Sequence, residues 1–349
     1  MTGTEAYLNR IGTAVPPHEV HGVFLEWANA RAGTGRDGAL FRRMATRSGI
    51  GQRWSVLPPG PTGSQVVSGF YGSAMPSTAA RMRIYADAAP PLALRAIAEL
   101  GDLGEISHLV VASCTGFMAP GLDQIVARAL DLPRNIHRTM IGFMGCYAAV
   151  VALRTAQEIV RATPTARVLM VAVELTTLHL QGTADVEALL AMLQFGDGAA
   201  AALVTAEPTG LALTRFSSTA VSDSEKLISW VIGDEGFVMQ LAGAVPGRIA
   251  DALRDPTTRD AVTGGRAVDA WAVHAGGRSV LDAVERALDL PGDALDHSRA
   301  VLRANGNMSS ATLLFVLARF LAGPPVEAGV GVAFGPGLAA EAFGFRSAA

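Results

Sequence analysis

The 349-residue sequence contains only two cysteines, Cys114 and Cys146, and this scarcity excludes two kinds of architecture. Two thiols are too few for a disulfide framework or for a thiolate metal cluster. The seven histidines are scattered without the spacing of metal ligands, so we predict no metal site. The chain also lacks a glycine-rich phosphate loop of the Walker or dinucleotide type and the Gly-x-Ser-x-Gly elbow of serine hydrolases.

Charge and long apolar runs are scarce as well. Charged residues make up 17% of the chain, the net charge is -3, and no basic run marks a nucleic-acid interface. No uninterrupted apolar stretch reaches the roughly 18 residues of a membrane span, and the amino terminus lacks the pattern of a secretory signal. We therefore expect a cytoplasmic protein that neither binds nucleic acid nor inserts into a membrane.

Half of the residues are hydrophobic, so a chain of this length can bury a sizeable core. Strand and helix patterns alternate, which predicts an α/β fold with layered sheets covered by helices. The main predicted helices cover residues 18–31, 84–100, 122–130, 141–162 and 184–194. The main predicted strands start near residues 7 and 106 and cover 166–174 and 199–205, while 58–76 is expected to be a loop.

The second half of the sequence repeats features of the first half. Ala129-Leu-Asp-Leu-Pro and Ala287-Leu-Asp-Leu-Pro each close a strand, loop and helix unit. After each unit comes a glycine-led helix start, Gly145-Cys146 in one half and Gly306-Asn307 in the other. We therefore predict two related βαβ-type halves, 1–208 and 209–349, which pack about a pseudo-twofold axis.

Cys146 is the candidate nucleophile because it lies at a predicted helix start. The first turn of a helix has unpaired N–H groups and a partial positive charge, which should make a thiol there easier to ionise. A free cysteine considered by itself is more often a buried core residue.

His274 and Asn307 occupy the matching positions of the second half, so the pseudo-twofold would bring them to Cys146. His274 ends an apolar strand and precedes Gly-Gly, and Asn307 opens a helix. Each also has a purely structural reading, as a strand-end histidine or a helix cap. Together, a cysteine–histidine pair generates thiolate and imidazolium, and amide and imidazole N–H groups can stabilise an enolate or oxyanion.

At these residues the sequence resembles the type III polyketide synthases, the chalcone and stilbene synthase-like family, from about residue 7 to its end. The motifs that carry the resemblance are Met144-Gly-Cys-Tyr-Ala-Ala, Leu193-Gln-Phe-Gly-Asp-Gly, Val273-His-Ala-Gly-Gly, Gly306-Asn-Met-Ser-Ser and Phe334-Gly-Pro-Gly-Leu. Ser113-Cys-Thr-Gly-Phe is similar to the bacterial branch. The resemblance implies a homodimer of thiolase-fold subunits, each with duplicated halves in five αβαβα layers.

The resemblance also implies roles for particular residues. Cys146 matches the nucleophile that carries the acyl chain, and His274 and Asn307 match its partners in decarboxylation. Further residues match positions that contact substrate: the gatekeepers Phe195 and Phe237, the cavity residues Cys114, Thr176, His179, Ile228 and Ser309, the partner-cavity residue Ala119, and the CoA-phosphate residues Arg43 and Arg47. A third cation of the CoA cluster aligns with Leu40.

The implied activity loads a starter acyl-CoA, extends it with malonyl-CoA by decarboxylative condensation, and cyclises the product to a pyrone, resorcinol or related phenol. CoA thioesters are substrates, and no cofactor is expected. Bulky His179 and Ile228, and a shorter segment 181–195, indicate a cavity unlike that of plant chalcone synthases. Two alternatives are a β-ketoacyl-ACP synthase III, which usually has His-Gln-Ala-Asn where this chain has His274-Ala-Gly-Gly, and an inactive partner subunit of the same fold.

Overall fold

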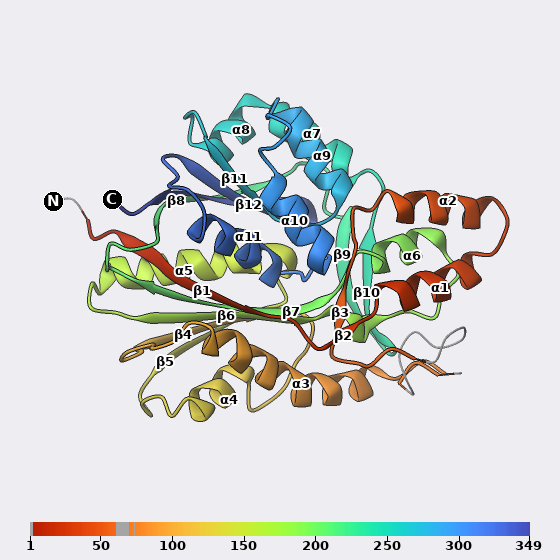
Figure 1. Cartoon of the computed structure of the whole chain (residues 1–349), viewed down its shortest axis with the longest axis horizontal. Helices are drawn as coiled ribbons and strands as arrows, with labels where there is room; N and C mark the ends of the chain where they lie inside the picture. Colours follow the sequence, from red (N-terminus) through yellow and green to blue (C-terminus); the bar gives the residue numbers. More distant parts are fainter. Residues whose placement is uncertain (1–2, 61–69, 73) are drawn as a thin grey trace.

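The computed structural model describes residues 3–60, 70–72 and 74–349 (Figure 1). The middle of the predicted loop 58–76 lies outside these residues. Within the described residues, no helix combines the length and apolar character needed to cross a membrane.

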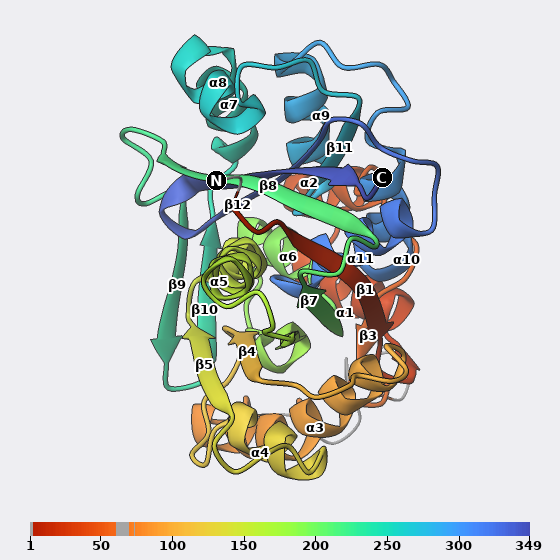
Figure 2. The same cartoon turned by 90° about the vertical axis from the view of Figure 1, so that its left-hand side faces the viewer.

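Nine strands form one continuous hydrogen-bonded sheet. Their order is β11 (Ala270–Val273), β12 (Gly329–Gly335), β13 (Ala339–Ser347), β8 (Leu211–Ala220), β1 (Ala6–Ala14), β7 (Asp197–Thr205), β6 (Val168–Leu175), β4 (His108–Ser113) and β5 (His137–Gly142). The β1–β8 pairing that joins the two parts covers only Ala6 to Leu8 against Leu213 to Leu211. On either side of this junction the sheet divides into a lower and an upper part (Figure 2).

The two parts of the sheet share one pattern of strand pairing. β4 and β6 are parallel, and β6–β7 and β7–β1 are antiparallel. β11 and β12 are likewise parallel, and β12–β13 and β13–β8 are antiparallel. The predicted duplication of an α/β unit is therefore confirmed. The two halves differ in one element. In the first half the strand β5 follows the helix α4 (Leu122–Ala129), whereas in the second half the helix α10 (Asp296–Asn305) occupies the corresponding place in the chain.

Three clusters of buried hydrophobic side chains lie between the helix layers and the sheet layers. The central cluster packs α5 (Ala148–Ala162) and α11 (Ala311–Leu321) between the two parts of the sheet. Side chains of a strand alternate between its faces, so Val110 and Ala112 of β4 join this cluster while Leu109 and Val111 face α3 (Thr78–Ala98) and α4. The third cluster lies between β11–β13 and the helices α7 (Val245–Arg254), α8 (Pro256–Thr263), α9 (Arg278–Ala287) and α10. The predicted five-layer arrangement is confirmed.

Smaller elements at one end surround the candidate site (Figure 1). They are α1 (His21–Ala32), α2 (Arg36–Thr46), α6 (Val186–Met192), the hairpin of β9 (Ile228–Gly233) and β10 (Gly236–Leu241), the short pair β2 (His18–Glu19) and β3 (Trp54–Ser55), and the 3-10 turns η1 (Gly145–Tyr147), η2 (Thr176–His179) and η3 (Pro336–Leu338). The predicted helix 18–31 begins at His21 because His18 and Glu19 pair with β3. The predicted helix 84–100 begins earlier, at Thr78, where the Ser77 hydroxyl accepts a hydrogen bond from the N–H of Ala80.

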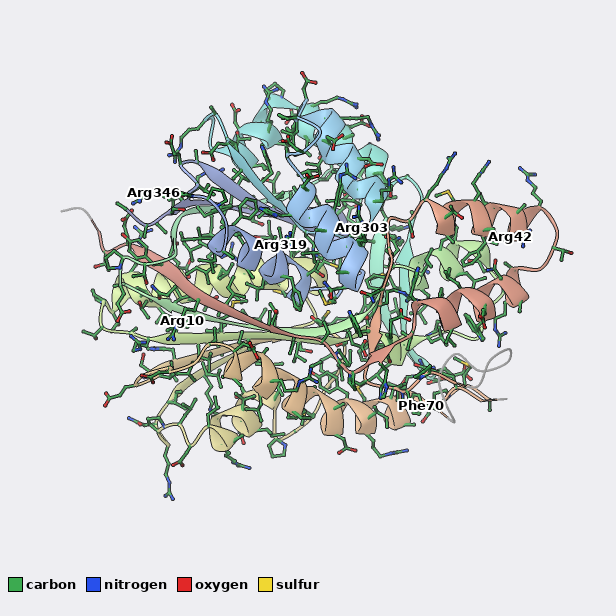
Figure 3. The ribbon with its side chains drawn as sticks, viewed as in Figure 1. Arg10, Arg42, Phe70, Arg303, Arg319 and Arg346 are labelled. Carbon is green, nitrogen blue, oxygen red and sulfur yellow. The ribbon has the colours of Figure 1, made fainter. Side chains whose placement is uncertain are left out.

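The two ends of the described chain lie together. Arg346, near the end of β13, forms an ion pair with Glu5 at 2.8 Å, just before β1 (Figure 3). This ion pair links β13, in the upper part of the sheet, to the residue that precedes β1 in the lower part.

Candidate active site

Cys146 lies in η1, the 3-10 turn between β5 and α5, and only 8% of it is exposed. Phe143 and Gly145 have positive φ angles of 58° and 73°, so the chain turns sharply before the cysteine. A Cβ atom on Gly145 would lie 2.6 Å from Cδ of Pro336. Only glycine therefore allows this turn to pack against η3, which explains why the sequence places a glycine immediately before the thiol.

His274 follows β11 and is 2% exposed. Its backbone N–H donates to the Val332 carbonyl at 2.8 Å, which continues the β11–β12 pairing by one residue. Neither ring nitrogen has a hydrogen-bond partner among the described residues. Burial lowers the pKa of His274 to about 4, so the ring is neutral and both nitrogens are available to a ligand.

Asn307 lies in the loop between α10 and α11. Its backbone N–H donates to Gln194 O at 2.7 Å, and its carbonyl accepts from Gly196 N at 3.0 Å, so the residue is tied to both sides of Phe195. Its Oδ1 accepts from Ser309 N at 2.8 Å, and its Nδ2 donates to Gly276 O at 3.2 Å. These bonds fix the orientation of the amide and leave the second Nδ2 hydrogen for the site.

The three predicted residues meet at the inner end of one tunnel. This tunnel has a volume of about 580 Å³, and Cys146, His274 and Asn307 all line it. Its outer part is lined from three sides by α2, α6 and α7, with Asp37, Leu40 and Met44 on the α2 side. The structure thus brings together the residues that the duplicated sequence pattern placed at matching positions.

The electrostatics of Cys146 differ from the sequence-based expectation. Burial raises the pKa of its thiol to about 11, and the negative charge of Glu174 adds to that effect. Hydrogen bonds from Ser309, Asn307 and its own N–H lower the pKa, but they do not outweigh burial. The expectation of an easily ionised thiol is therefore wrong, because the desolvation that comes with burial exceeds the contribution of the helix start.

Two further spaces lie behind the thiol. The cysteine cavity, of about 250 Å³, is lined by Cys146 together with five of the predicted residues: Cys114, Thr176, Phe195, Ile228 and Ser309. The rear chamber, of about 80 Å³, lies beyond it and is lined by His179 and Phe237. Phe195 and Met239 line the tunnel, the cavity and the chamber.

His179 was expected to line the cysteine cavity and Phe237 to stand between the tunnel and that cavity. Neither residue lines the cysteine cavity or the tunnel. Their rings stack at 4.1 Å. His179 Nδ1 accepts from the N–H of Phe237 at 3.0 Å, so its Nε2 carries the proton and donates to Thr115 O at 2.7 Å. Burial lowers the pKa of His179 to about 3, which keeps this arrangement neutral. The pair forms a fixed wall of the rear chamber.

Three other predicted residues line none of these spaces. Arg43 lies in α2 and Arg47 is the C-cap residue of that helix, and both are outside the tunnel lining, which includes Leu40 and Met44. Ala119 belongs to the loop before α4 and lines none of the three spaces in a single chain. Among residues 3–60, 70–72 and 74–349, no cluster of three or more His, Cys, Asp or Glu side chains is placed to hold a metal ion.

Sequence reasoning missed Trp230 and Met239, which face each other across the β9–β10 hairpin. Trp230 lies between the cysteine cavity and the rear chamber, with ring centroids 6.5 Å from Phe195 and 6.1 Å from Phe237. Because side chains of a strand alternate between its faces, Trp230 shares a face with Ile228, and its cross-strand partner Met239 shares that face with Phe237. That period-two pattern is the signal that could have found them.

Glu174 was also missed. This fully buried carboxylate accepts hydrogen bonds from the N–H of Cys114 at 3.0 Å, from the Thr115 hydroxyl at 2.8 Å and from the Ser310 hydroxyl. It joins the loop after β4 to the loop before α11. A single glutamate at the end of an apolar strand gives no such signal in the sequence.

Comparison with known proteins identifies the family. The family model for the N-terminal domain of chalcone and stilbene synthases matches residues 3–208, and that for the C-terminal domain matches residues 212–349. The chain belongs to this family. It is a type III polyketide synthase, an acyltransferase with the thiolase fold.

Individual relatives agree with this assignment. The chain is 33% identical to bisdemethoxycurcumin synthase of Oryza sativa over 86% of this chain and 81% of the relative. It is 32% identical to the α-pyrone synthesis polyketide synthase-like Pks18 of Mycobacterium tuberculosis, over 75% and 71%. Among solved structures, PKS-I of the brown alga Ectocarpus siliculosus superposes with a TM-score of 0.88, 28% identity and 99% coverage of both chains. CsyB complexed with CoA-SH shares the fold, with a TM-score of 0.84, 23% identity and coverage of 98% and 100%.

Proposed function

We propose that this type III polyketide synthase loads a starter acyl-CoA on Cys146, extends it with malonyl-CoA and cyclises the product. The observation that supports the proposal is the meeting of Cys146, His274 and Asn307 where the 580 Å³ tunnel reaches the 250 Å³ cysteine cavity. The tunnel suits the delivery of a thioester, and the cavity behind the sulfur provides space for a growing chain.

In the loading step, an unpartnered nitrogen of His274 accepts the proton of the Cys146 thiol as the sulfur attacks the starter carbonyl. The bond between the carbonyl carbon and the CoA sulfur then breaks. The proton passes from the imidazolium to the departing CoA thiolate, so CoA leaves as a thiol. The low pKa of His274 favours this return of the proton and restores a neutral ring with one N–H.

In the decarboxylation step, the malonyl group occupies the inner end of the tunnel, next to Cys146. Apolar Phe195, Met239 and Phe334 line it, and such a wall disfavours a carboxylate relative to neutral CO₂. As the C–C bond breaks, its electron pair moves onto the thioester and forms an enolate. The free N–H of Asn307 Nδ2 and the N–H of His274 donate hydrogen bonds to the enolate oxygen, where the negative charge develops.

In the condensation step, the enolate carbon attacks the carbonyl of the Cys146 thioester, and the cysteine sulfur departs. The chain, now two carbons longer, is carried by CoA and returns to Cys146 for another cycle. CoA thioesters are the only carriers in this scheme, which draws on no resident metal or cofactor. We also propose a cytoplasmic location, because both substrates are CoA thioesters.

The experiment that tests the proposal incubates the purified protein with malonyl-CoA and a panel of acyl-CoAs, with mass spectrometry of products and measurement of CO₂. The scheme assigns condensation to Cys146 and decarboxylation to His274 and Asn307. Cys146→Ala should therefore abolish products while CO₂ release continues, and Asn307→Ala should reduce both. Full condensation by Cys146→Ala would overturn the assignment.

We further propose that Arg43, Arg47 and Arg278 bind the CoA phosphates at the tunnel mouth. Nη1 of Arg278, at the start of α9, lies 3.4 Å from the carbonyl oxygen of Arg47, and its neighbours Ser279 and Val280 line the tunnel. Arg278 thus supplies a third cation beside Arg47, at the carboxyl end of α2, whereas the family's third cation aligns with Leu40. Asp185 and Glu187 line the α6 side of the tunnel, so the phosphates would lie on the α2–α9 side.

We propose a homodimer formed through the edge strand β5. This strand pairs only with β4 among the described strands, and His137 to Met140 are exposed. An unpaired edge presents N–H and C=O groups that can pair with a second copy. Met140 and the nearby loop residue Phe117 are large apolar side chains that are 43% and 48% exposed. A second copy on this side would cover both, and would place the Ala119 loop at the subunit boundary.

A further inference from the structure

Arg53, immediately before β3, is a buried cation that the chemistry proposed above does not use. It is 2% exposed, and none of the ion pairs between described residues includes it. Its Nη2 is buried without an acceptor among those residues. Burial lowers the pKa of Arg53 to about 9, although the charges of Glu19 and Asp197 oppose this effect. A cation held in this way costs stability, so stability alone does not explain an arginine here.

The other N–H groups of the guanidinium hold the backbone around Phe195. Nη1 donates to the carbonyl of Met192 at 3.0 Å and to that of Phe195 at 2.7 Å. Nε donates to Nδ1 of His21 at 3.0 Å, and Cζ lies 4.4 Å from the centroid of the Phe24 ring. Burial and the charge of Arg53 lower the pKa of His21 to about 4, so its ring is neutral and Nδ1 remains an acceptor. These contacts fix both the position and the plane of the guanidinium.

Three consecutive carbonyls around Phe195 are each held by a different part of the chain. The donors and their acceptors are the N–H of Asn307 with Gln194 O at 2.7 Å, Nη1 of Arg53 with Phe195 O at 2.7 Å, and the hydroxyl of Thr176 with Gly196 O at 2.5 Å. Of these three donors only Arg53 is charged, and a hydrogen bond from a charged donor is about twice as strong as a neutral one. Arg53 therefore makes the strongest of the three attachments, and it makes it at Phe195 itself.

The side chain of Arg53 also packs against the turn that carries Asn307. Gly306 has a positive φ of 68°, and a Cβ atom there would lie 2.9 Å from Cγ of Arg53 and 2.7 Å from Gln194 O. Glycine therefore allows the turn to approach both groups closely. One side chain thus contacts two parts of the site, Phe195 through its carbonyl and Asn307 through the turn before it.

We propose that Arg53 is a positioning residue that holds the Phe195 ring and the Asn307 amide at a fixed distance from each other. The inference rests on the proposed function, in which Asn307 stabilises the enolate and Phe195 lines the space where the enolate reaches the thioester on Cys146. Arg53 lines neither the tunnel nor the cysteine cavity, so it acts through these residues. Its planar fork reaches two carbonyls and His21 at once, whereas the ammonium of a lysine has the same charge without this geometry.

The test measures CO₂ release and C–C bond formation by Arg53→Lys over a range of malonyl-CoA concentrations, per mole of folded protein. An error of about 1 Å in position can slow a reaction about 100-fold, so kcat for CO₂ release should fall about tenfold or more while KM stays within about twofold. The ratio of CO₂ released to C–C bonds formed should rise, because an enolate that is poorly aligned with the thioester takes a proton from water and leaves as acetyl-CoA. An unchanged kcat and an unchanged ratio would overturn the proposal.

Arg81 provides the matched control. It is fully buried, lines none of the three spaces, and donates through Nη1 to the carbonyls of Leu178 and Leu180 at 2.8 Å each. Arg81→Lys should lower the Tm as Arg53→Lys does and leave the ratio of CO₂ to C–C bonds unchanged. An equal rise of this ratio in both variants would overturn the proposal, because the loss of any buried guanidinium would then produce it.

A pair of variants at His21 gives a second readout if Arg53→Lys does not fold. His21→Leu removes the acceptor of Arg53 Nε and should raise the ratio of CO₂ to C–C bonds, whereas His21→Asn keeps an acceptor oxygen and should retain the wild-type ratio. A wild-type ratio in folded His21→Leu would overturn the role of Arg53 while leaving the polyketide synthase reaction intact. Absence of condensation with every starter by the folded wild-type protein would instead exclude the proposed function.

Discussion

At the scale of single residues, Ser309 lowers the pKa of two thiols, those of Cys114 and Cys146. Its hydroxyl lies 3.3 Å from the Cys114 sulfur and also forms a hydrogen bond that lowers the pKa of Cys146. Burial and the charge of Glu174 raise the pKa of Cys114 well above its usual value. Ser309 itself has a positive φ of 47°, a conformation that a non-glycine residue adopts only where its surroundings hold it. Burial therefore raises the pKa of both thiols, and the Cys146 thiol is the more readily ionised of the two.

We predict that Ser309→Ala slows the alkylation of Cys146 by iodoacetamide. The hydrogen bond stabilises the thiolate, so its loss raises the pKa and leaves less thiolate at any pH below it. A hydrogen bond to a charged group contributes about 1.5 kcal/mol, which corresponds to an approximately tenfold slower rate at pH 8. The rate is measured by mass spectrometry between pH 7 and 9.

Ser229→Ala is the matched control, because Ser229 lines the same cavity but bonds to Gln240. Equal rates in Ser309→Ala and the wild type would contradict this role of Ser309, as would label on Cys114 instead of Cys146.

At the scale of elements, α2 and α9 approach each other at the tunnel mouth although they are far apart in the sequence. Arg278 reaches the carboxyl end of α2, and its Nε also lies 3.5 Å from Asp282 within α9. This intrahelical pair is partly exposed and holds the side chain weakly. The guanidinium is therefore free to turn toward a phosphate.

We predict that Arg278→Ala raises KM for malonyl-CoA about fivefold, as expected for an exposed charge contact worth about 1 kcal/mol. A malonyl thioester of pantetheine, which lacks the nucleotide phosphates, should bind the variant and the wild type equally. Arg286→Ala, an exposed arginine at the other end of α9, is the control. An equal change for both thioesters would show that Arg278 acts on the fold rather than on the phosphates.

The order of elements and the meeting of the catalytic trio were predictable, because periodicity and glycine-led turns are local features of the sequence. Gly145 and Gly306 mark the two turns that carry Cys146 and Asn307. Three features were not predictable. The pKa of Cys146 depends on burial by distant segments, the position of Phe237 depends on its stacking with His179, and the proximity of Arg278 to α2 depends on how the two halves pack.

At the scale of the whole molecule, the sheet has two ends with different surroundings. β11 ends the upper part among α7, α9 and α10, whereas β5 ends the lower part with an exposed row of side chains. β5 and the β9–β10 hairpin, with its exposed Val231 and Ile232, lie along the same side of the molecule (Figure 2). Exposed large apolar side chains beside an unpaired edge strand are typical of a site of association between two copies.

We predict that Met140→Glu converts the proposed dimer to a monomer, because it places a charge at an exposed apolar side chain that the second copy would cover. Analytical ultracentrifugation measures the mass. Ala30→Glu introduces the same charge at an exposed position of α1, at the opposite end of the molecule from β5 (Figure 1), and should leave the dimer intact. A monomeric wild type, or a dimeric Met140→Glu variant, would contradict an interface at β5.

Whether Cys146 carries the acyl chain is measured most directly by peptide mass spectrometry after brief exposure of the protein to octanoyl-CoA without malonyl-CoA. We expect an octanoyl thioester on the peptide that contains Cys146, no adduct on Cys114, and loss of the adduct in Cys146→Ala. Subsequent addition of malonyl-CoA should remove the adduct from the wild type as condensed product forms. An octanoyl adduct of equal amount in Cys146→Ala, or condensation without any adduct on Cys146, would show that Cys146 is not the acyl carrier.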